Sequence, residues 1–383
     1  MPAEPAAVAL PPGLTWRADT GQWVVRTHDL ADVALRDPHI GMALDSGPSA
    51  VALPSAAEIP SVSQFFALWY HRGASHPVFS RALRRAYAPA AVDEFADAFT
   101  ALAAARMAVL PAAGDLVTAF VEPFCLDGTF RLMGFPPERW PTLAKVYTIV
   151  MSVIRARFRG VLELPQRQTA AFTAAMRALR AAVDELTAGP PVTPLVAALQ
   201  RYAEAEGPDP WADVATVAQL LAAGVPQVTT GIAVACHALY RDPAALAAAR
   251  AGDVAYADVA EEAMRLSPPF LGVYGWVVAD CDCLGIRLRP GDAVVVDIVA
   301  VNVDPARVAD PAAFCPGRGR SAAVTFGKGA HYCLGAASAR LQVTAGLAAV
   351  AGHRPVRLDV SGYRLDDDGF AQTVHALPYR MVG

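Results

Sequence analysis

The 383-residue chain has few cysteines, no excess of positive charge and no long uninterrupted apolar run. Its six cysteines are scattered, which argues against a disulfide framework and favours a reducing, cytoplasmic setting. A formal net charge of −4 lacks the basic excess that nucleic acid attracts, so we expect no nucleic-acid partner. The most apolar windows are interrupted by Gly, Pro, Gln, Arg or Asp, so we expect no membrane span.

The N-terminal sequence, MPAEPAAVALPPGLTW, lacks the basic and then apolar order of a signal peptide. It carries prolines and an acidic residue at those positions instead. We therefore expect residues 1–15 to form a flexible N-terminal arm that precedes the folded chain.

Two of the cysteines, Cys281 and Cys283, lie close together in the sequence DCDCLG. This spacing is tempting as half of a metal site. No second Cys or His pair at zinc spacing lies near it in the sequence, so a turn between two strands is the favoured interpretation.

Hydrophobic periodicity predicts a mainly helical chain with a minor β portion. Two short strands around ADTG open the fold, followed by a helix that ends at RDP. From Phe95 to about Ala205 the pattern is helical, with breaks at LPAAGD, GFPPERWP and TAGPPVTP. Residues 270–300 favour β-structure, and a last long helix from about Gly335 precedes one or two more strands. With no repeat and no obvious linker, we expect a single domain over residues 1–383.

One apolar helix contains its own interruption. The stretch LLAAGVPQVTTGIAVACHAL, residues 220–239, holds Gly224, Pro226 and Gln227 in its middle. A proline inside a helix removes one backbone hydrogen bond and crowds the carbonyl four residues back, at a cost of about 3 kcal/mol. The sequence therefore predicts a core helix that is broken at this point.

The stretch with the most chemical content is FGKGAHYCLG, residues 326–335. Two glycines two residues apart allow a tight turn that brings the backbone close to a flat ligand. A cysteine just before a helix has its thiolate favoured by the helix dipole, which suits an axial iron ligand. The alternatives are a phosphate-binding loop or a turn with a buried cysteine, but GKG lacks the G-x-x-x-x-G-K-[ST] frame.

This loop resembles the heme-binding signature of the cytochrome P450 family, F-G-x-G-x-H-x-C-x-G, at every fixed position. Further segments are similar to the family's first strand pair and B helix, its C helix and its E-x-x-R helix: WVVRTHDLADVALRDP, SHPVFSRALRRAYAP and EEAMRLSPP. The resemblance implies the cytochrome P450 fold, an α-rich triangular prism with small β-sheets. It also implies heme b (iron protoporphyrin IX) as the cofactor.

The resemblance implies roles for individual residues around the heme. Cys333 is the expected metal ligand, and Glu262 with Arg265 is the expected structural lock. The expected heme contacts are Phe326, Gly327, His331, Gly335, His76 and Arg81. Both histidines are expected to donate toward heme propionates.

The chain departs from the family at three positions that usually carry an arginine. They are Ser80, Gly275 and Ala313. Propionates are anions that need partners. The sequence leaves two alternatives open. Arg81, Arg84 or another arginine takes the place of the missing arginines, or the propionates are more hydrated than usual.

The interrupted helix is similar to the family's I helix and is expected over the distal heme face. Its A-G-x-[DE]-T frame begins at Ala223, so Pro226 and Gln227 occupy the acid and threonine positions that usually deliver protons to dioxygen. We expect Pro226, Gln227 and Thr229 to border the oxygen pocket. Four alternatives stay open for this helix. The substrate supplies the protons, Gln227 holds a water that supplies them, the enzyme uses peroxide directly, or the kink only shapes the pocket.

The resemblance also implies a substrate pocket with apolar and aromatic walls. The expected lining residues are Phe66, Trp69, Gly224, Phe270, Val273 and Val374. Such walls suit a small aromatic or polycyclic specialised metabolite. We expect hydroxylation or oxidative C–C, C–N or C–O coupling with O2 and electrons from ferredoxin and ferredoxin reductase. A peroxide-driven enzyme and a non-catalytic heme sensor or gas binder are the alternatives.

Overall fold

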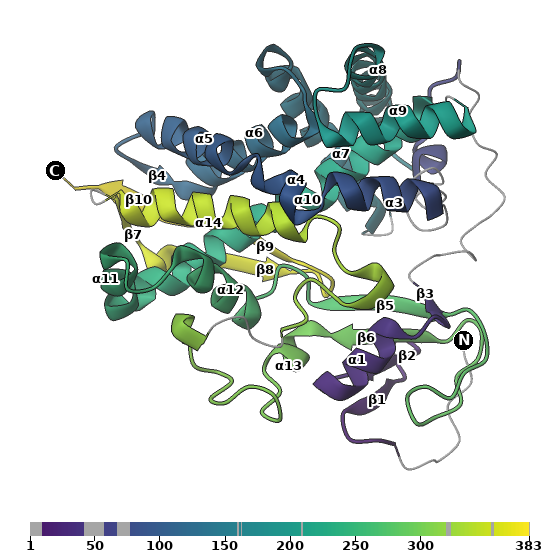
Figure 1. Cartoon of the computed structure of the whole chain (residues 1–383), viewed down its shortest axis with the longest axis vertical. Coiled ribbons are helices and arrows are strands. Elements are labelled where there is room, and N and C mark those ends of the chain that lie inside the picture. Colours follow the sequence, from purple (N-terminus) through teal and green to yellow (C-terminus); the bar gives the residue numbers. More distant parts are fainter. Residues whose placement is uncertain are drawn as a thin grey trace. The chain divides into compact units, whose positions relative to one another are not determined.

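The computed structural model in Figure 1 describes most of the chain. The described residues are 10–41, 57–66, 77–158, 161, 163–207, 210–318, 323–353 and 356–382. The chain divides into two compact units. The first unit comprises residues 1–44, 103–123 and 227–383, and the second comprises residues 45–102 and 124–226. The expectation of a single domain stays a prediction.

A five-stranded mixed sheet supports the first unit. Its strands are β1 (Leu14–Arg17), β2 (Gln22–Val25), β3 (Ile40–Gly41), β5 (Gly272–Val277) and β6 (Ala293–Asp297). Their order is β1-β2-β6-β5-β3, with β2 and β6 parallel and the other neighbours antiparallel. β-Branched and aromatic side chains such as Trp23, Val294 and Val296 fill its core. The predicted ADTG hairpin is confirmed by the pairing of β1 with β2.

Two smaller sheets also belong to the first unit. Their strands are β4 (Ala113–Asp115), β7 (Val356–Leu358), β8 (Arg364–Asp367), β9 (Gln372–Ala376) and β10 (Pro378–Met381). The orders are β4-β10-β7 and β8-β9. The tail was predicted to hold one or two strands but contains three, because β9 and β10 are separate strands that join different sheets.

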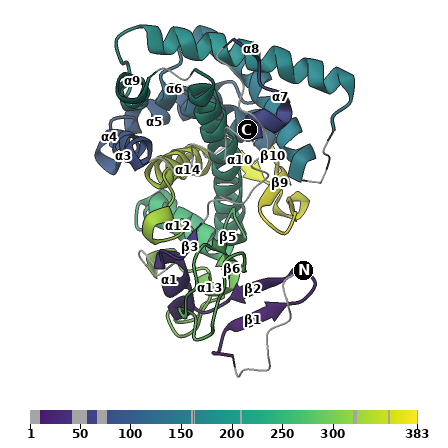
Figure 2. The same ribbon diagram turned by 90° about the vertical axis from the view of Figure 1, so that its right-hand side faces the viewer.

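Five α-helices in the described residues lie wholly in the first unit. They are α1 (His28–Arg36), α11 (Pro243–Ala251), α12 (Tyr256–Leu266), α13 (Ile298–Asn302) and α14 (Ala336–Gly352). Helices α12 and α14 pack side by side, as both views show (Figures 1 and 2). The predicted start of the last helix is confirmed, because Gly335 is the N-cap of α14. The predicted helix that ends at RDP is α1.

The second unit is helical. The helices that lie wholly or partly in it are α3 (Pro77–Ala86), α4 (Pro89–Asp93), α5 (Ala96–Ala108), α6 (Glu122–Met133), α7 (Trp140–Phe158), α8 (Gln166–Ala188), α9 (Pro194–Glu206) and the first half of α10 (Pro210–Arg241). Its core is rich in phenylalanine, with Phe124 and Phe172 almost fully buried. The three predicted breaks are confirmed. A fourth break separates α7 from α8, where Pro165 is the N-cap of α8.

The predicted break in the apolar helix is wrong, because α10 runs without interruption through Pro226. The proline costs about 3 kcal/mol. Close to it, Val225, Val228 and Ile232 are buried, and each buried side chain contributes about 1.5–3 kcal/mol. Burial on both sides of the proline therefore outweighs the lost backbone bond.

Helix α10 is also long and apolar enough to cross a membrane by length and composition alone. In the most apolar window, 67% is buried inside the protein. That burial is typical of the central helix of a folded core.

The predicted N-terminal arm does not extend to residue 15. Leu14 and Thr15 already belong to β1, and Leu14 is buried in the sheet core. The strand forms because Leu14 pairs with Val25 and Thr15 pairs with Val24 on β2. Residues 1–9 lie outside the described part of the chain.

Candidate functional site

The glycine-rich loop forms a compact turn that presents Cys333 just before α14. The backbone N–H of Cys333 donates to the carbonyl of Phe326 at 2.8 Å, and Gly327 donates to Val324 at 2.8 Å. Gly327 and Gly329 have φ values of 67° and 66°, in the left-handed region that other residues rarely adopt. The glycines predicted from the motif are therefore required by the path of the backbone.

Gly329 also lies against the end of α1. A Cβ atom at this position would lie 2.4 Å from the carbonyl oxygen of Leu35 and 3.2 Å from the Cα of Arg36. Backbone atoms cannot give way as a flexible side chain does. The close approach of the loop to α1 thus holds the cysteine turn in one position.

The thiol of Cys333 is accessible to solvent. Burial by the surrounding protein nevertheless raises the pKa of this thiol, while the N–H of Gly335 and the guanidinium of Arg340 act in the opposite direction. Those two groups stabilise the thiolate, and a bound metal ion deprotonates a coordinating thiol outright. Cys333 therefore has the accessibility and the electrostatic surroundings of a metal ligand.

Arg340 is a residue of the site that the sequence analysis missed. Its guanidinium lies over the ring of Phe326, 4.2 Å from the ring centre, and donates to the hydroxyl of Tyr332 at 2.9 Å. It also forms an ion pair with Glu261. Arg340 lies seven residues after the cysteine and is the fifth residue of α14, and this spacing was the available signal.

Glu262 and Arg265 form a fully buried bidentate ion pair on α12. The two nitrogen–oxygen distances are 2.7 and 2.8 Å, and the side chain of Arg265 has no exposed surface. The remaining donors of Arg265 reach the carbonyls of Asn302, Pro311 and Ala313 at 3.0, 2.7 and 3.2 Å. One helix turn thereby holds the irregular chain that leads to the cysteine loop.

Glu262 is charged at neutral pH despite its burial. Burial alone would raise the pKa of this carboxyl, but hydrogen bonds from Arg265 and from the N–H of Cys315 outweigh it, so the pKa is lowered. Arg318 adds a third contact, with its Nε atom 3.3 Å from the carboxylate. Arg318, five residues after Ala313, thus supplies an arginine in contact with this glutamate.

Asn302 is a second residue that the sequence analysis missed. Its amide oxygen accepts from the N–H of Val324 at 2.7 Å, and its amide nitrogen donates to Thr325 at 3.0 Å and to the carbonyl of Arg265 at 3.2 Å. It is almost fully buried. Asn302 therefore ties the ion pair to the two residues that precede Phe326.

The other positions without the usual arginine behave differently from Ala313. At Gly275 a Cβ atom would lie 2.8 Å from the side chain of Ile40, so the strand leaves no room for a long side chain without movement. Ser80 lies on α3, but its side chain is outside the described part of the structure. Arg81, one of the expected substitutes, lies next to it on α3 and is exposed. Which cation meets a propionate stays a prediction.

The predicted distal residues include two polar groups without a partner. The amide oxygen of Gln227 and the hydroxyl of Thr229 are buried and have no hydrogen-bond partner among the described residues. The next residue, Thr230, donates instead to the carbonyl of Gln372 at 3.2 Å. Unpaired buried polar atoms cost about 1–3 kcal/mol each, and an ordered water or a bound ligand is the usual partner of such atoms.

The predicted substrate-pocket residues have mixed surroundings. In the first unit, Val374 is buried, and Phe270 packs edge-on against Phe370 with ring centres 5.1 Å apart. Val273 packs at the edge of the sheet core. In the second unit, Phe66 is buried beside Phe65, while a Cβ atom on Gly224 would meet open space.

Some predicted residues cannot be placed. Trp69, His76 and the side chain of His331 lie outside the described residues.

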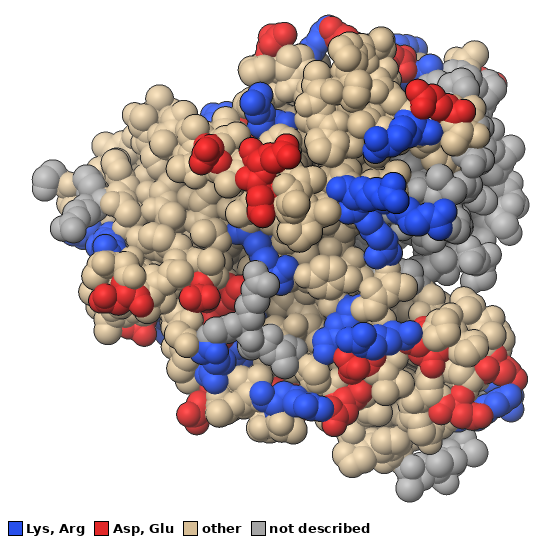
Figure 3. Space-filling view, viewed as in Figure 1, with Lys and Arg blue, Asp and Glu red and all other residues tan. Residues whose placement is uncertain are grey.

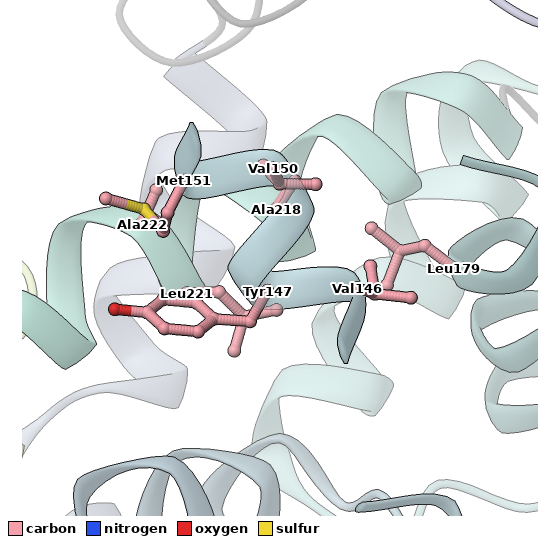
Figure 4. Close-up of a pocket in the computed structure, with 8 residues that line it drawn as sticks. All are labelled: Val146, Tyr147, Val150, Met151, Leu179, Ala218, Leu221 and Ala222. Atoms are coloured by element: carbon pink, nitrogen blue, oxygen red, sulfur yellow. The ribbon is translucent and has the colours of Figure 1, made fainter. Parts of the chain in front are cut away.

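A cavity within the second unit is too small for a metabolite, because its volume of about 10 Å³ suits a single water. Figure 4 shows its lining side chains, which come from α7, α8 and α10.

The residues around Cys333 fit an iron porphyrin with a thiolate ligand. The donor is a soft sulfur that is accessible to solvent, and the adjacent backbone is built from glycines that allow close approach. Among the described contacts, no oxygen or imidazole nitrogen that would compete as an iron ligand is hydrogen-bonded to the thiol.

The chain is similar to several known proteins. A family model described as Cytochrome P450 matches residues 256–351. "Cytochrome p450 CYP199A2" from Rhodopseudomonas palustris is 28% identical over 285 residues, which cover 73% of this chain and 67% of that protein. "2-hydroxy-5-methyl-1-naphthoate 7-hydroxylase" from Streptomyces carzinostaticus is 29% identical over 44% of this chain and 43% of its own length.

Solved structures match along almost the whole chain. Mycobacterium smegmatis CYP164A2 with econazole bound has a TM-score of 0.77 and 25% identity, and the match covers 96% of this chain and 93% of that one. CxnD, described as an enzyme for C–S bond formation in chuangxinmycin biosynthesis, has a TM-score of 0.74 and 20% identity, with 97% and 89% covered. The second similarity bears on the fold alone.

Proposed function

We propose that this chain, which belongs to the cytochrome P450 family, oxidises a small aromatic or polycyclic specialised metabolite. As a member of this family it is a heme-dependent oxidoreductase of the monooxygenase type. The reaction is a hydroxylation or an oxidative C–C, C–N or C–O coupling, and the setting is the cytoplasm. The observation that carries the proposal is the accessible Cys333 thiol, held between the glycine turn and α14. Heme b is the proposed cofactor.

When bound, the heme supplies dioxygen binding and the oxidising power that the side chains lack. Cys333 would hold it through its thiolate sulfur. The N–H of Gly335 and the guanidinium of Arg340 stabilise the negative charge on the sulfur. Glu262 and Arg265 keep the preceding chain in place, so the thiolate position does not depend on the heme alone.

Gln227 and Thr229 are proposed to bind polar groups on the distal side. An amide oxygen accepts a hydrogen bond but does not titrate, so Gln227 orients a water or a substrate hydroxyl without supplying a proton itself. A proton then comes from that water or from the substrate. The lack of a titrating side chain here favours chemistry with a polar substrate group beside the oxygen site. It also makes oxidative coupling more credible than in family members that carry an acid and a threonine at these positions.

Aromatic substrates are proposed because of the pocket chemistry and the relatives. The candidate lining residues Phe66 and Phe270 carry aromatic side chains. One relative is named as a hydroxylase of a naphthoate, and a protein of the same fold is described as forming a C–S bond. These names belong to those proteins and motivate the proposal for this one.

We further propose that ferredoxin and ferredoxin reductase deliver the electrons. Arg81, Arg84 and Arg85 are exposed on α3, and Figure 3 shows basic side chains gathered over this helix. Such a surface attracts an acidic electron carrier.

The test is product analysis with labelled dioxygen. Candidate metabolites are first selected by the heme-spectrum change that they cause on binding, and are then incubated with ferredoxin, its reductase and NAD(P)H. Label in the product identifies hydroxylation, and an unlabelled coupled product identifies oxidative coupling. Turnover with peroxide alone supports the peroxide-driven alternative. Binding without NAD(P)H consumption or product supports a sensor and contradicts the proposed enzyme.

The double substitution Pro226→Glu with Gln227→Thr restores the family's acid and threonine. We expect it to raise the product formed per NAD(P)H and to reduce peroxide release by about tenfold, because a positioned proton donor contributes at least that much. Pro226→Ala is the matched control, since it restores a helix N–H without adding a titratable group. Equal gains in both variants, or no change in the double variant, would contradict a missing proton relay.

A further inference from the structure

Two thiols and a carboxylate meet in the first unit, in a cluster separate from the cysteine turn before α14. The thiols belong to Cys281 and Cys283, between β5 and β6, and the carboxylate belongs to Asp37, which follows α1. Their ligand atoms all lie within 4.8 Å of one another, and the two sulfurs are 3.4 Å apart. The sequence alone favours a plain turn here, because no local pattern pairs residue 37 with residues 281 and 283.

The local backbone explains why the thiols face Asp37. Cys281 exchanges two backbone hydrogen bonds with Leu288, which makes its segment extended. Side chains alternate along such a segment, so the acids on either side of Cys281, Asp280 and Asp282, are exposed and pair with Arg287 at 2.8 Å each. Cys281 is buried, and Cys283 is half-buried.

The carboxylate is held in a fixed orientation. One oxygen of Asp37 accepts from the backbone N–H of His39 at 2.8 Å and lies 2.9 Å from its Nδ1 atom. The Asp37 side chain also accepts a hydrogen bond from the Cys283 thiol. Metal-binding carboxylates are commonly oriented by such a second hydrogen-bonding partner. The side chain of Asp37 is 17% exposed, so a small ion has access.

We propose that Asp37, Cys281 and Cys283 bind one divalent ion of the zinc type, with water in the fourth position. Zn–S bonds of about 2.3 Å in a tetrahedral site place two sulfurs about 3.8 Å apart, so the thiols need to separate by only a few tenths of an ångström. A disulfide would need a separation of about 2.05 Å, which is a much larger change from 3.4 Å. Two thiolates and one carboxylate carry three negative charges, which a divalent cation largely offsets.

The ion would join the end of α1 to the segment between β5 and β6. The backbone of Val278 already donates to the carbonyl of His39 at 2.8 Å, so the two segments are neighbours without the ion. Binding to the folded state alone stabilises that state. The site is independent of the proposed oxidation chemistry, because none of its residues belongs to the cysteine loop or to α10.

The test uses the heme-loaded protein, freed of metal by a chelator under reducing conditions and then titrated with Zn²⁺ against a chelating dye. We expect one Zn²⁺ per chain, a rise of a few degrees in melting temperature, and two sulfur scatterers at about 2.3 Å in zinc X-ray absorption. Cys283→Ser should weaken binding by about 100-fold or more, and Asp37→Asn by at least about tenfold. Cys315→Ser removes an exposed thiol elsewhere and should change nothing.

Three results would overturn the proposal. The first is that the unmodified protein binds Zn²⁺ no more tightly than the Cys283→Ser variant. The second is bound zinc that shows only nitrogen and oxygen scatterers. The third is a disulfide between Cys281 and Cys283 in freshly isolated protein. The heme spectrum and circular dichroism of each variant must match the unmodified protein. Asp37→Asn keeps the size of the side chain, so it provides a result even where a cysteine substitution disturbs folding.

Discussion

Cys333→Ser is expected to leave the chain folded while abolishing the thiolate-type spectrum of the reduced, carbon monoxide-bound heme. The side chain is accessible to solvent, and its replacement removes no packed core atoms. A serine hydroxyl does not supply the soft anionic ligand that a thiolate does. The measurement is the carbon monoxide difference spectrum with heme content per chain, beside the melting temperature of the heme-free protein.

Cys315→Ser is the matched control for this substitution. Cys315 is also an exposed free thiol, and its contact with Glu262 uses the backbone N–H, which a serine keeps. This variant should retain the full thiolate-type spectrum. An unchanged spectrum in Cys333→Ser would mean that the heme is held by another residue, and the assignment of the cysteine loop would be wrong.

Arg265→Ala is expected to cost about 3–5 kcal/mol of unfolding free energy, because it leaves a buried carboxylate without its partner. Glu262 is only 3% exposed, and Arg265 also holds three backbone carbonyls of the chain before the cysteine loop. Urea unfolding of the heme-free protein measures the loss. Because the same bonds position the loop, heme content should fall in parallel.

An exposed ion pair provides the control for this second prediction. Arg139 and Glu185 are 2.6 Å apart, with 49% and 58% of their side chains exposed. Arg139→Ala should therefore cost no more than about 1 kcal/mol. If Arg265→Ala costs as little as this control, the buried pair does not hold the loop as the contacts indicate.

Local patterns predicted the elements that carry the site. The ADTG hairpin, the end of α1 and the start of α14 at Gly335 each follow from turn residues and caps within a few positions. The cysteine turn was predictable because its glycines and its cysteine are consecutive in the chain. The Glu262–Arg265 pair was predictable because residues three apart share one helix face.

Contacts between distant segments were not predictable in this way. Arg318 reaches Glu262 across 56 residues, and Asn302 ties Arg265 to Val324 through a loop whose path no periodic pattern defines. The unbroken course of α10 through Pro226 was missed for a related reason. Its flanking side chains are buried by neighbours that a local cost for proline does not include.

Iron X-ray absorption of the unmodified ferric protein tests the central claim most directly, because it reports the atoms bound to the heme iron. The claim is that Cys333 presents a thiolate to the iron from the turn before α14. It predicts one sulfur scatterer beside the porphyrin nitrogens, and the loss of that sulfur in Cys333→Ser. A first shell of nitrogen and oxygen alone in the unmodified protein would contradict it.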